Sequence, residues 1–317
     1  MSKPLNRLNP IESLLSRQDV LVLDGALATE LERYGCDLDD PLWSARVLLE
    51  QPEAIKQVHA DYYRAGADCS ITASYQATVD GFGGRGFTKE EALSLIRKTV
   101  TLATEARDKV LEEDPDRERP LVAASVGPYG AYLADGSEYV GQYSITDEEL
   151  YAFHKPRMEA LIEAGADLLA IETIPSFREA RILASILKET PEVYAWLSFT
   201  LTDGRTISDG TLLKDVANEF EGNSQLAAIG VNCAPLEVVT DAVENLHNYT
   251  TKPIIVYPNS GESYDPDTKT WHGSESCESF PAQSEAWYKA GARVIGGCCR
   301  TTPEHVKELS LKWKNKA

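Results

Sequence analysis

The stretch Glu163-Ala164-Gly165-Ala166-Asp167-Leu168-Leu169-Ala170-Ile171 passes from the end of a helix directly into an apolar strand. Gly165 suits the left-handed position that ends many helices, and the run 168–171 is apolar enough to be buried on both faces. The same junction recurs at Arg64-Ala65-Gly66-Ala67-Asp68 and at Lys289-Ala290-Gly291-Ala292-Arg293. A repeated helix-to-strand junction of this kind indicates parallel strands covered by helices.

Outward from this junction, eight apolar strand-like segments alternate with helix-like segments along the whole chain. The expected strands are 20–23, 67–75, 121–126, 167–171, 193–199, 228–231, 253–257 and 293–295. The expected helices are 29–33, 52–65, 89–111, 147–164, 177–188, 212–220, 236–246, 279–290 and 303–313. Eight such units in 317 residues predict a (β/α)8 TIM barrel rather than a doubly wound sheet. We expect one domain over residues 1–317, with loops at 81–86 and 112–119.

The composition and charge of the chain indicate which kinds of molecule it is expected to bind. The chain has 31 Lys and Arg against 50 Asp and Glu, a formal charge of -19, which disfavours nucleic acid and anionic membrane and favours a cationic small molecule. No charge-free apolar run reaches the length of a membrane span, and the first residues lack the apolar core of a signal peptide. We therefore expect a cytoplasmic protein, in which the six cysteines do not form a disulfide framework.

Three cysteines follow expected strands directly. Cys233 comes after the strand at 228–231, and the sequence Gly296-Gly297-Cys298-Cys299 comes after the strand at 293–295. The carboxyl ends of barrel strands form one face, which is the face that carries active sites, and a single strand separates these two in the ring. Three thiolates suit Zn²⁺ and leave its fourth position open, as in catalytic zinc sites.

Spacing alone leaves a second interpretation of these thiols open. Cys233 could be a small core residue and Cys298-Cys299 a chance pair, because the chain contains no C-x-x-C pattern. If the metal is present, the two glycines before the pair would let the backbone bend so that both neighbouring side chains reach it.

Carboxylates and aromatic residues also stand near the expected strand ends. Asp24 and Glu172 could bind an ammonium group, although for either residue taken alone a salt bridge to a neighbouring Arg or Lys is the better explanation. Trp43, Tyr75 and Tyr129 offer aromatic faces, which attract cations such as sulfonium and quaternary ammonium groups. Ordinary loop packing is the alternative for each of these rings.

Taken together, these segments resemble the zinc-dependent homocysteine S-methyltransferases, and in particular the subgroup that uses S-methylmethionine. The similarity extends over nearly the whole chain, and the Cys-Cys pair with a distant third Cys is its most specific feature. The segments that carry it are 24–31, 71–77, 125–130, 230–233, 256–262 and 296–303.

The resemblance implies a site and a reaction. It implies zinc held by Cys233, Cys298 and Cys299, which binds homocysteine through its sulfur. It implies that the substrate amino acid is held by Asp24, Gly25, Thr72 and Glu172, and that Trp43 and Tyr75 border the methyl donor. The sulfonium methyl of S-methylmethionine, or as an alternative that of S-adenosylmethionine, would then pass to homocysteine to give methionine.

Other functions remain open at this point. Betaine is an alternative donor, but the chain lacks the long C-terminal extension of relatives that use betaine, so a monomer or small homo-oligomer is expected. Methylation of another thiol or a selenol is a further alternative. A zinc hydrolase would require histidine and carboxylate ligands, whereas a non-catalytic barrel could use the thiols for metal storage or redox sensing.

Overall fold

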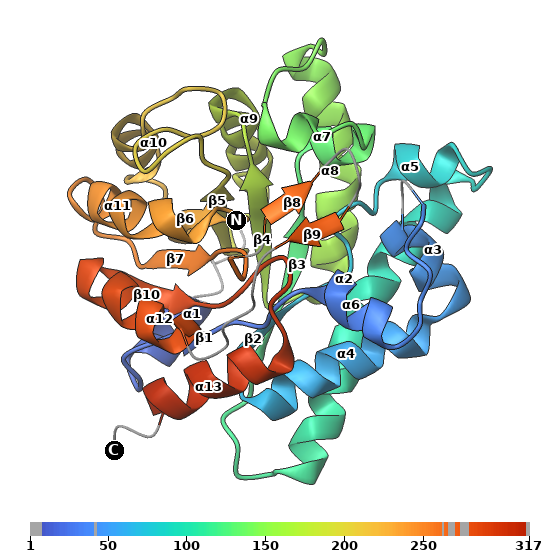
Figure 1. The fold of residues 1–317 in the computed structure, drawn as a ribbon. Helices are drawn as coiled ribbons and strands as arrows, with labels where there is room; N and C mark the ends of the chain where they lie inside the picture. Colours follow the sequence, from blue (N-terminus) through green and yellow to red (C-terminus); the bar gives the residue numbers. More distant parts are fainter. Residues whose placement is uncertain (1–7, 41–42, 262, 266–269, 273–278, 315–317) are drawn as a thin grey trace, which may run out of the picture.

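The computed structural model describes residues 8–40, 43–261, 263–265, 270–272 and 279–314. Eight parallel strands form the centre of the molecule, with helices around them (Figure 1). These strands are β1 (Leu21–Val22), β2 (Cys69–Ile71), β3 (Leu121–Val126), β4 (Leu168–Ile174), β5 (Ala195–Phe199), β6 (Leu226–Asn232), β7 (Ile254–Tyr257) and β10 (Ala292–Ile295).

The strands follow one another in the order β1-β10-β7-β6-β5-β4-β3-β2, and every neighbouring pair is parallel. A parallel bridge between Leu23 and Cys69 brings β2 back beside β1. The predicted TIM barrel in a single domain is therefore confirmed.

Helices precede, connect and cover the strands. The longer ones are α4 (Pro52–Ala65), α6 (Lys89–Glu113), α8 (Asp147–Glu163), α9 (Phe177–Leu187), α10 (Leu213–Phe220), α11 (Leu236–His247), α12 (Ser279–Ala290) and α13 (Pro303–Lys314). The shorter ones are α1 (Pro10–Leu15), α2 (Leu27–Arg33), α3 (Trp43–Glu50), α5 (Val79–Gly83), α7 (Tyr129–Leu133) and the 3-10 turn η1 (Ser137–Tyr139). An antiparallel hairpin, β8 (Ser263–Asp265) and β9 (Thr270–His272), follows β7.

The repeated junctions act as the sequence predicts. Gly66, Gly165 and Gly291 have φ angles of +109°, +85° and +130°, a region that L side chains rarely adopt. The aspartate that follows two of them accepts a hydrogen bond from the preceding strand. Asp68 Oδ2 binds the Val22 amide at 2.9 Å, and Asp167 Oδ2 binds the amide of the second residue of β3 at 2.8 Å. All three junctions thus end a helix, and the two that carry an aspartate also tie two strands together.

Two apolar layers stabilise the barrel. Alternate strand residues point inward and pack with Ile11 and Leu14 of α1, which covers the amino-terminal end of the ring. The opposite strand faces pack against the surrounding helices. Burial of this much apolar surface is the main contribution to folding, and it leaves the carboxyl ends of the strands to hold polar groups.

Several short elements were not expected from the sequence. The expected loop 81–86 is helical in its first part, because α5 continues to Gly83 and is capped by Thr78. The helices α1, α3 and α7, the turn η1 and the β8–β9 hairpin were not predicted either. Elements of three to six residues, such as α1, α7, η1 and the two hairpin strands, are too short for a hydrophobic period to develop. The helix α3 is as long as α10, which was predicted, so length does not explain its omission.

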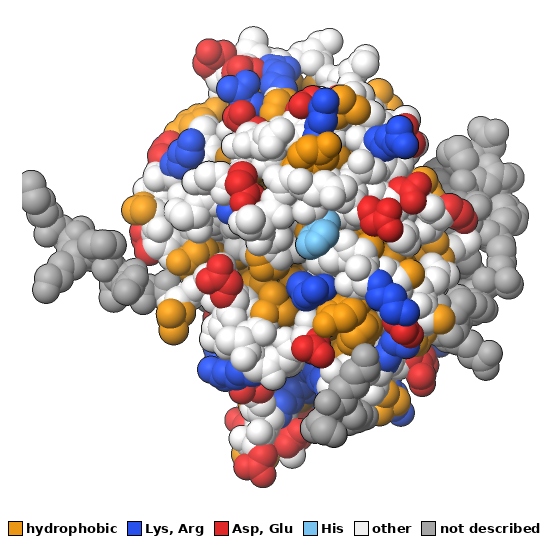
Figure 2. Space-filling model, turned by 90° about the vertical axis from the view of Figure 1, so that its left-hand side faces the viewer, with side chains coloured by type: hydrophobic (Ala, Val, Ile, Leu, Met, Phe, Trp, Pro, Cys, Tyr) orange, Lys and Arg blue, Asp and Glu red, His pale blue; other side chains and the backbone are white. Residues whose placement is uncertain are grey.

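None of the helices in the described part of the chain is long and apolar enough to cross a membrane. On the face shown in Figure 2, acidic and basic side chains alternate over short distances. The excess of acid therefore does not form one uniform field on that face.

A substitution at Gly230 tests how closely β6 packs against β7. An added Cβ at this position would overlap the backbone oxygen of Ile255. Because that neighbour is backbone, it cannot rotate away, and Gly230→Ala should lower the free energy of unfolding by about 3 kcal/mol or more. Gly83→Ala is the matched control, since no heavy atom lies within 4 Å of a Cβ added there. Equal denaturant midpoints for the two variants would contradict this account of the sheet.

Candidate metal centre

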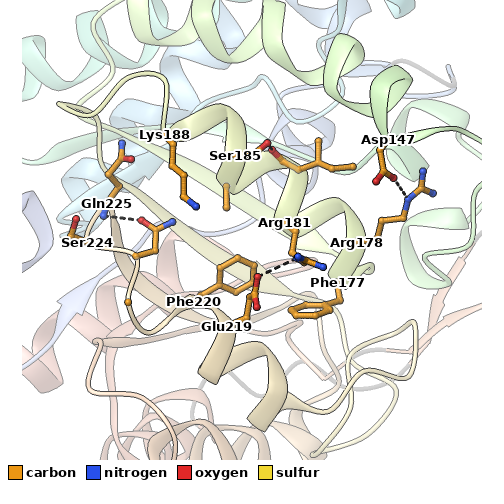
Figure 3. Close-up of a pocket in the computed structure, with 14 residues that line it drawn as sticks. Asp147, Phe177, Arg178, Arg181, Ser185, Lys188, Glu219, Phe220, Ser224 and Gln225 are labelled. Carbon is orange, nitrogen blue, oxygen red and sulfur yellow. Dashed lines mark hydrogen bonds and ion pairs between the residues drawn. The ribbon is translucent and has the colours of Figure 1, made fainter.

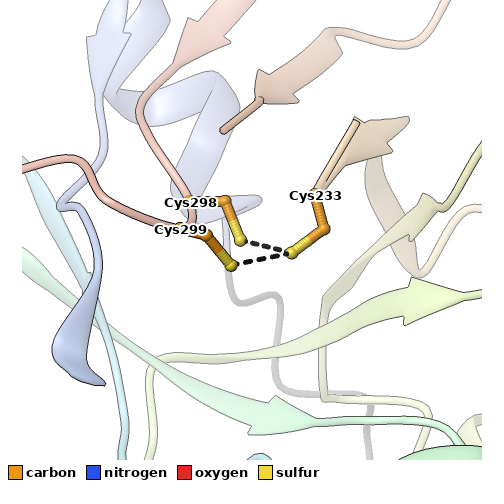
Figure 4. A group of neighbouring side chains, drawn as sticks. All are labelled: Cys233, Cys298 and Cys299. Carbon is orange, nitrogen blue, oxygen red and sulfur yellow. Dashed lines mark hydrogen bonds between the residues drawn. The ribbon is translucent and has the colours of Figure 1, made fainter. Parts of the chain in front are cut away.

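Three sulfur atoms converge at the carboxyl ends of β6 and β10 (Figure 4). Cys233 Sγ lies 2.6 Å from Cys298 Sγ and 3.7 Å from Cys299 Sγ, and all three lie within 4.8 Å of one another. The three cysteines are free rather than disulfide-bonded. A tetrahedral zinc with Zn–S bonds of about 2.3 Å places its sulfurs roughly 3.8 Å apart. The group therefore fits a zinc site after a small movement of Cys298.

The end of β7 holds both sides of this thiol group. The Cys298 amide donates to Pro258 O at 2.7 Å, and the Cys233 amide donates to Tyr257 O at 3.2 Å. The strand between β6 and β10 thus sets the separation of the two cysteine segments. This position confirms the prediction that one strand separates them in the ring.

Gly296 and Gly297 allow the turn that follows β10 to pass close to β1. A Cβ on Gly296 would overlap the side chain of Leu23, and a Cβ on Gly297 would overlap that of Thr301. The Thr301 hydroxyl in turn donates to Cys298 O at 2.7 Å. The two glycines are needed here for close packing, which brings both neighbouring thiols to the same point.

Backbone strain accompanies the site. Thr173, Cys233 and Arg300 have φ angles of +59°, +50° and +66°, which are unfavourable for residues with a Cβ and are found most often at functional positions. Asn232 holds Thr173 in this conformation. Its Oδ1 accepts from the Thr173 amide at 2.8 Å, and its Nδ2 donates to Thr173 Oγ1 at 2.7 Å.

Asp24 is buried beside the pocket and is held from one side only. Its Oδ2 accepts from Ser70 Oγ at 2.6 Å and from the Ile71 amide at 2.8 Å, whereas Oδ1 accepts no hydrogen bond from the described residues. Since Ser70 Oγ donates to Asp24, it accepts from His59 Nδ1 at 2.8 Å. Burial raises the pKa of Asp24 to about 7, with a further contribution from the charge of Glu172.

Glu172 stands at the end of β4 and is supported by two neighbouring strands. The Ser125 hydroxyl donates to its carboxylate, and the Ser125 amide donates to Thr72 Oγ1 at 3.0 Å. Burial raises the pKa of Glu172 to about 7. Thr72, the predicted polar position, therefore lies near Glu172. Its hydroxyl holds Ser125, and Ser125 in turn orients the carboxylate of Glu172.

These groups surround a pocket of about 340 Å³ at the mouth of the barrel. The structure brings together most of the predicted site residues. Those that line the pocket are Gly25, Thr72, Tyr75, Glu172, Cys233, Cys298 and Cys299. Asp24 is close by, because its bonding partner Ile71 is part of the lining. Trp43 begins α3, but its side chain lies outside the described residues.

The sequence did not identify several other residues that line the pocket. These are Glu32, Gln76, Glu138, Tyr139, Thr173, Tyr257 and Arg300, together with the first residues of α2. Tyr257 and Arg300 occur in segments that support the family resemblance, which could have indicated them. Glu138 and Tyr139 had no such signal, because they belong to the turn η1. Tyr129 does not line the pocket and packs instead against Tyr132, Tyr143 and Phe153.

A larger hollow of about 760 Å³ lies on the outside of the barrel, between α9 and α10 (Figure 3). Four of its five charged side chains are paired, Arg178 with Asp147 and Arg181 with Glu219 at 3.1 Å, and Lys188 is the fifth. Its lining includes no thiol and no carboxyl end of a strand. The smaller pocket, which contains the three thiols, is therefore the better candidate for an active site.

Comparisons with known proteins agree with this site. Residues 21–312 match the family model described as "Homocysteine S-methyltransferase". The chain is 56% identical over 306 residues to "Homocysteine S-methyltransferase YbgG" of Bacillus subtilis (strain 168), covering 96% of this chain and 97% of that protein. It is 54% identical over 309 residues to "Homocysteine S-methyltransferase" of Escherichia coli (strain K12), covering 97% and 100%.

A solved structure extends the similarity to three dimensions. The metallated form of the homocysteine methyltransferase MmuM from Escherichia coli superposes with a TM-score of 0.87 at 51% identity, covering 96% of this chain and 99% of that one.

Asp24→Asn should change how stability depends on pH. In the folded protein the raised pKa keeps Asp24 protonated up to about pH 7, whereas in the unfolded chain it ionises near pH 4. As the pH rises from 4 to 7, Asp24 ionises in the unfolded chain but not in the folded protein, so the free energy of unfolding of the wild type falls. Asparagine does not ionise, so the variant does not show this fall. Between pH 5 and pH 8 the variant should gain about 3 kcal/mol relative to wild type in urea unfolding. The same difference at both pH values would show that the pKa is not raised.

Cys298→Ala should remove bound metal, because two thiolates hold zinc far less well than three. Zinc per chain, measured by elemental analysis after dialysis, should fall from about one in the wild type to near zero. Cys36→Ala is the matched control, since Cys36 is buried against Gln51 outside the pocket. Full zinc retention in the Cys298 variant would exclude the proposed ligand set.

Proposed function

The chain belongs to the homocysteine S-methyltransferase family, and we propose that it transfers the methyl group of S-methylmethionine to the sulfur of homocysteine. The observation that carries this proposal is the group of three thiols at the mouth of a barrel pocket. A zinc ion held there would keep the homocysteine sulfur as a thiolate at neutral pH. The three cysteines Cys233, Cys298 and Cys299 would hold that ion.

The buried carboxyl groups serve the amino-acid end of homocysteine. Asp24 follows β1 and Glu172 lies in β4, three strands further round the ring, and burial raises the pKa of each to about 7. An ammonium group between them would favour their charged forms and would supply the donor that Asp24 Oδ1 lacks. Gly25 and Thr72 line the same pocket and complete this part of the site.

The reaction itself requires orientation more than proton transfer. The homocysteine sulfur attacks the sulfonium methyl from the side opposite its leaving sulfur. The new S–CH3 bond forms as the old one breaks, and the leaving sulfur takes the bonding pair. With S-methylmethionine as donor, both products are methionine. Holding two reactants in line can lower the free-energy barrier by about 7–11 kcal/mol in favourable cases.

Pocket size and lining favour S-methylmethionine as the donor. A volume of about 340 Å³ is near the lower limit of small-molecule pockets, roughly 300–1,000 Å³. It therefore suits two amino-acid-sized molecules better than one that carries adenosine. Tyr75, Tyr139 and Tyr257 line the pocket, and aromatic faces attract sulfonium groups. The expected donor role of Trp43, the cytoplasmic location and the monomer or small homo-oligomer stay predictions.

A donor comparison tests the proposal. Purified, reduced, zinc-loaded protein is given homocysteine with S-methylmethionine, S-adenosylmethionine or betaine, and methionine is measured. We expect turnover at least tenfold faster with S-methylmethionine than with either alternative, and loss of that turnover after chelation. Turnover only with betaine would assign the chain to another donor class. No turnover with homocysteine, but methylation of another thiol or a selenol, would correct the acceptor.

A further inference from the structure

Two carboxylates that line the pocket, Glu32 and Glu138, have no role in the reaction described above, and Glu138 is the more buried of the two. Glu138 lies in the turn η1 and lines the pocket. Its Oε2 is shielded from solvent and accepts no hydrogen bond from the described residues. An unsatisfied buried carboxylate oxygen is costly in a folded protein. A small rotation of the side chain would turn this oxygen into the pocket, where a donor group on a bound molecule would satisfy it.

The turn that carries Glu138 is fixed to the barrel. Its backbone packs directly on Gly130, where any Cβ would overlap the Glu138 amide. Glu138 O accepts from Thr200 Oγ1 at 3.4 Å, just beyond the end of β5. Gly141, at φ +75°, packs on Pro175 beyond the end of β4, where an added Cβ would lie 2.8 Å from the proline oxygen. Three separate contacts thus hold the backbone of this turn in one place, and with it the position from which the Glu138 side chain extends.

Acidic side chains outnumber basic ones among the described residues that line the pocket. Among the described residues that line the pocket, the acidic ones are Glu32, Glu138 and Glu172, and the basic one is Arg300. Arg300 lies 3.9 Å from Glu32 at the rim. Glu172 is already assigned to the homocysteine ammonium. The remaining negative charge on Glu138 therefore suits the reactant that carries a net positive charge, which is the methyl donor.

We propose that Glu138 binds the α-ammonium group of the methyl donor and so selects a sulfonium amino acid. This inference rests on the function proposed above and extends it to the second substrate. An ammonium offers N–H groups that satisfy Oε2, whereas the quaternary nitrogen of betaine has none. A dimethylsulfonium carboxylate that lacks an amino group, such as dimethylsulfoniopropionate, would leave Oε2 unsatisfied. The turn η1 then distinguishes donors that carry the same reactive methyl sulfonium.

The test compares Glu138→Gln with wild type in zinc-loaded protein. We expect the Kd of S-methylmethionine, measured by calorimetry without homocysteine, to rise about tenfold or more, because a charge-assisted hydrogen bond is lost. The Kd of homocysteine should change less than twofold. In turnover, the preference of wild type for S-methylmethionine over dimethylsulfoniopropionate should largely disappear in the variant. Glu148→Gln, the same substitution at an exposed position in the first turn of α8, is the control and should leave all three quantities unchanged.

Each other outcome has a distinct meaning. Wild-type protein that binds and uses S-methylmethionine, together with an unchanged Glu138→Gln variant, would overturn this inference and leave the proposed function intact. Wild-type protein that does not bind S-methylmethionine would overturn both. A selective rise in the Kd of homocysteine would place Glu138 at the acceptor instead. Loss of zinc in the variant would make Glu138 part of the metal site and would also exclude the proposal.

Discussion

Close packing at the end of β10 is the constraint on which the metal site depends. Gly296 passes beside Leu23 of the first strand segment, and Gly297 passes beside Thr301, with no room for a Cβ at either position. This contact brings Cys298 and Cys299 to the mouth of the barrel, where the end of β7 sets their distance from Cys233. Neither the thiol group nor the barrel closure would form if the last strand were displaced by a side chain.

The barrel concentrates its unfavourable features at the same end. Strained backbone occurs at Thr173, Cys233 and Arg300, and buried carboxyl groups occur at Asp24 and Glu172. Elsewhere the strands are apolar on both faces and α1 packs inside the amino-terminal end. The stability of that core offsets the cost of ordering polar groups that wait for a ligand, which is the usual relation between a rigid scaffold and its site.

In our interpretation the two substrates are bound by two different kinds of structural element. Strand ends provide the thiols and the carboxyl groups for homocysteine, so the acceptor site is as rigid as the sheet itself. The turn η1 provides Glu138 for the donor, and its contacts with Gly130 and Thr200 fasten it to the neighbouring strands. Relatives with the same thiol group could change donor through this turn without altering the acceptor chemistry.

The sequence by itself determined the order of strands and helices, the junctions at Gly66, Gly165 and Gly291, and the placement of three cysteines just after two strands. These features are local, because hydrophobic period and left-handed glycine positions act over a few residues. Only the tertiary structure decided that the thiols converge, that Asp24 and Glu172 are buried, and that Glu138 enters the pocket. Those facts depend on closure of the ring and on contacts between residues far apart in the chain. Short segments such as η1 have no period of their own that could reveal where they pack.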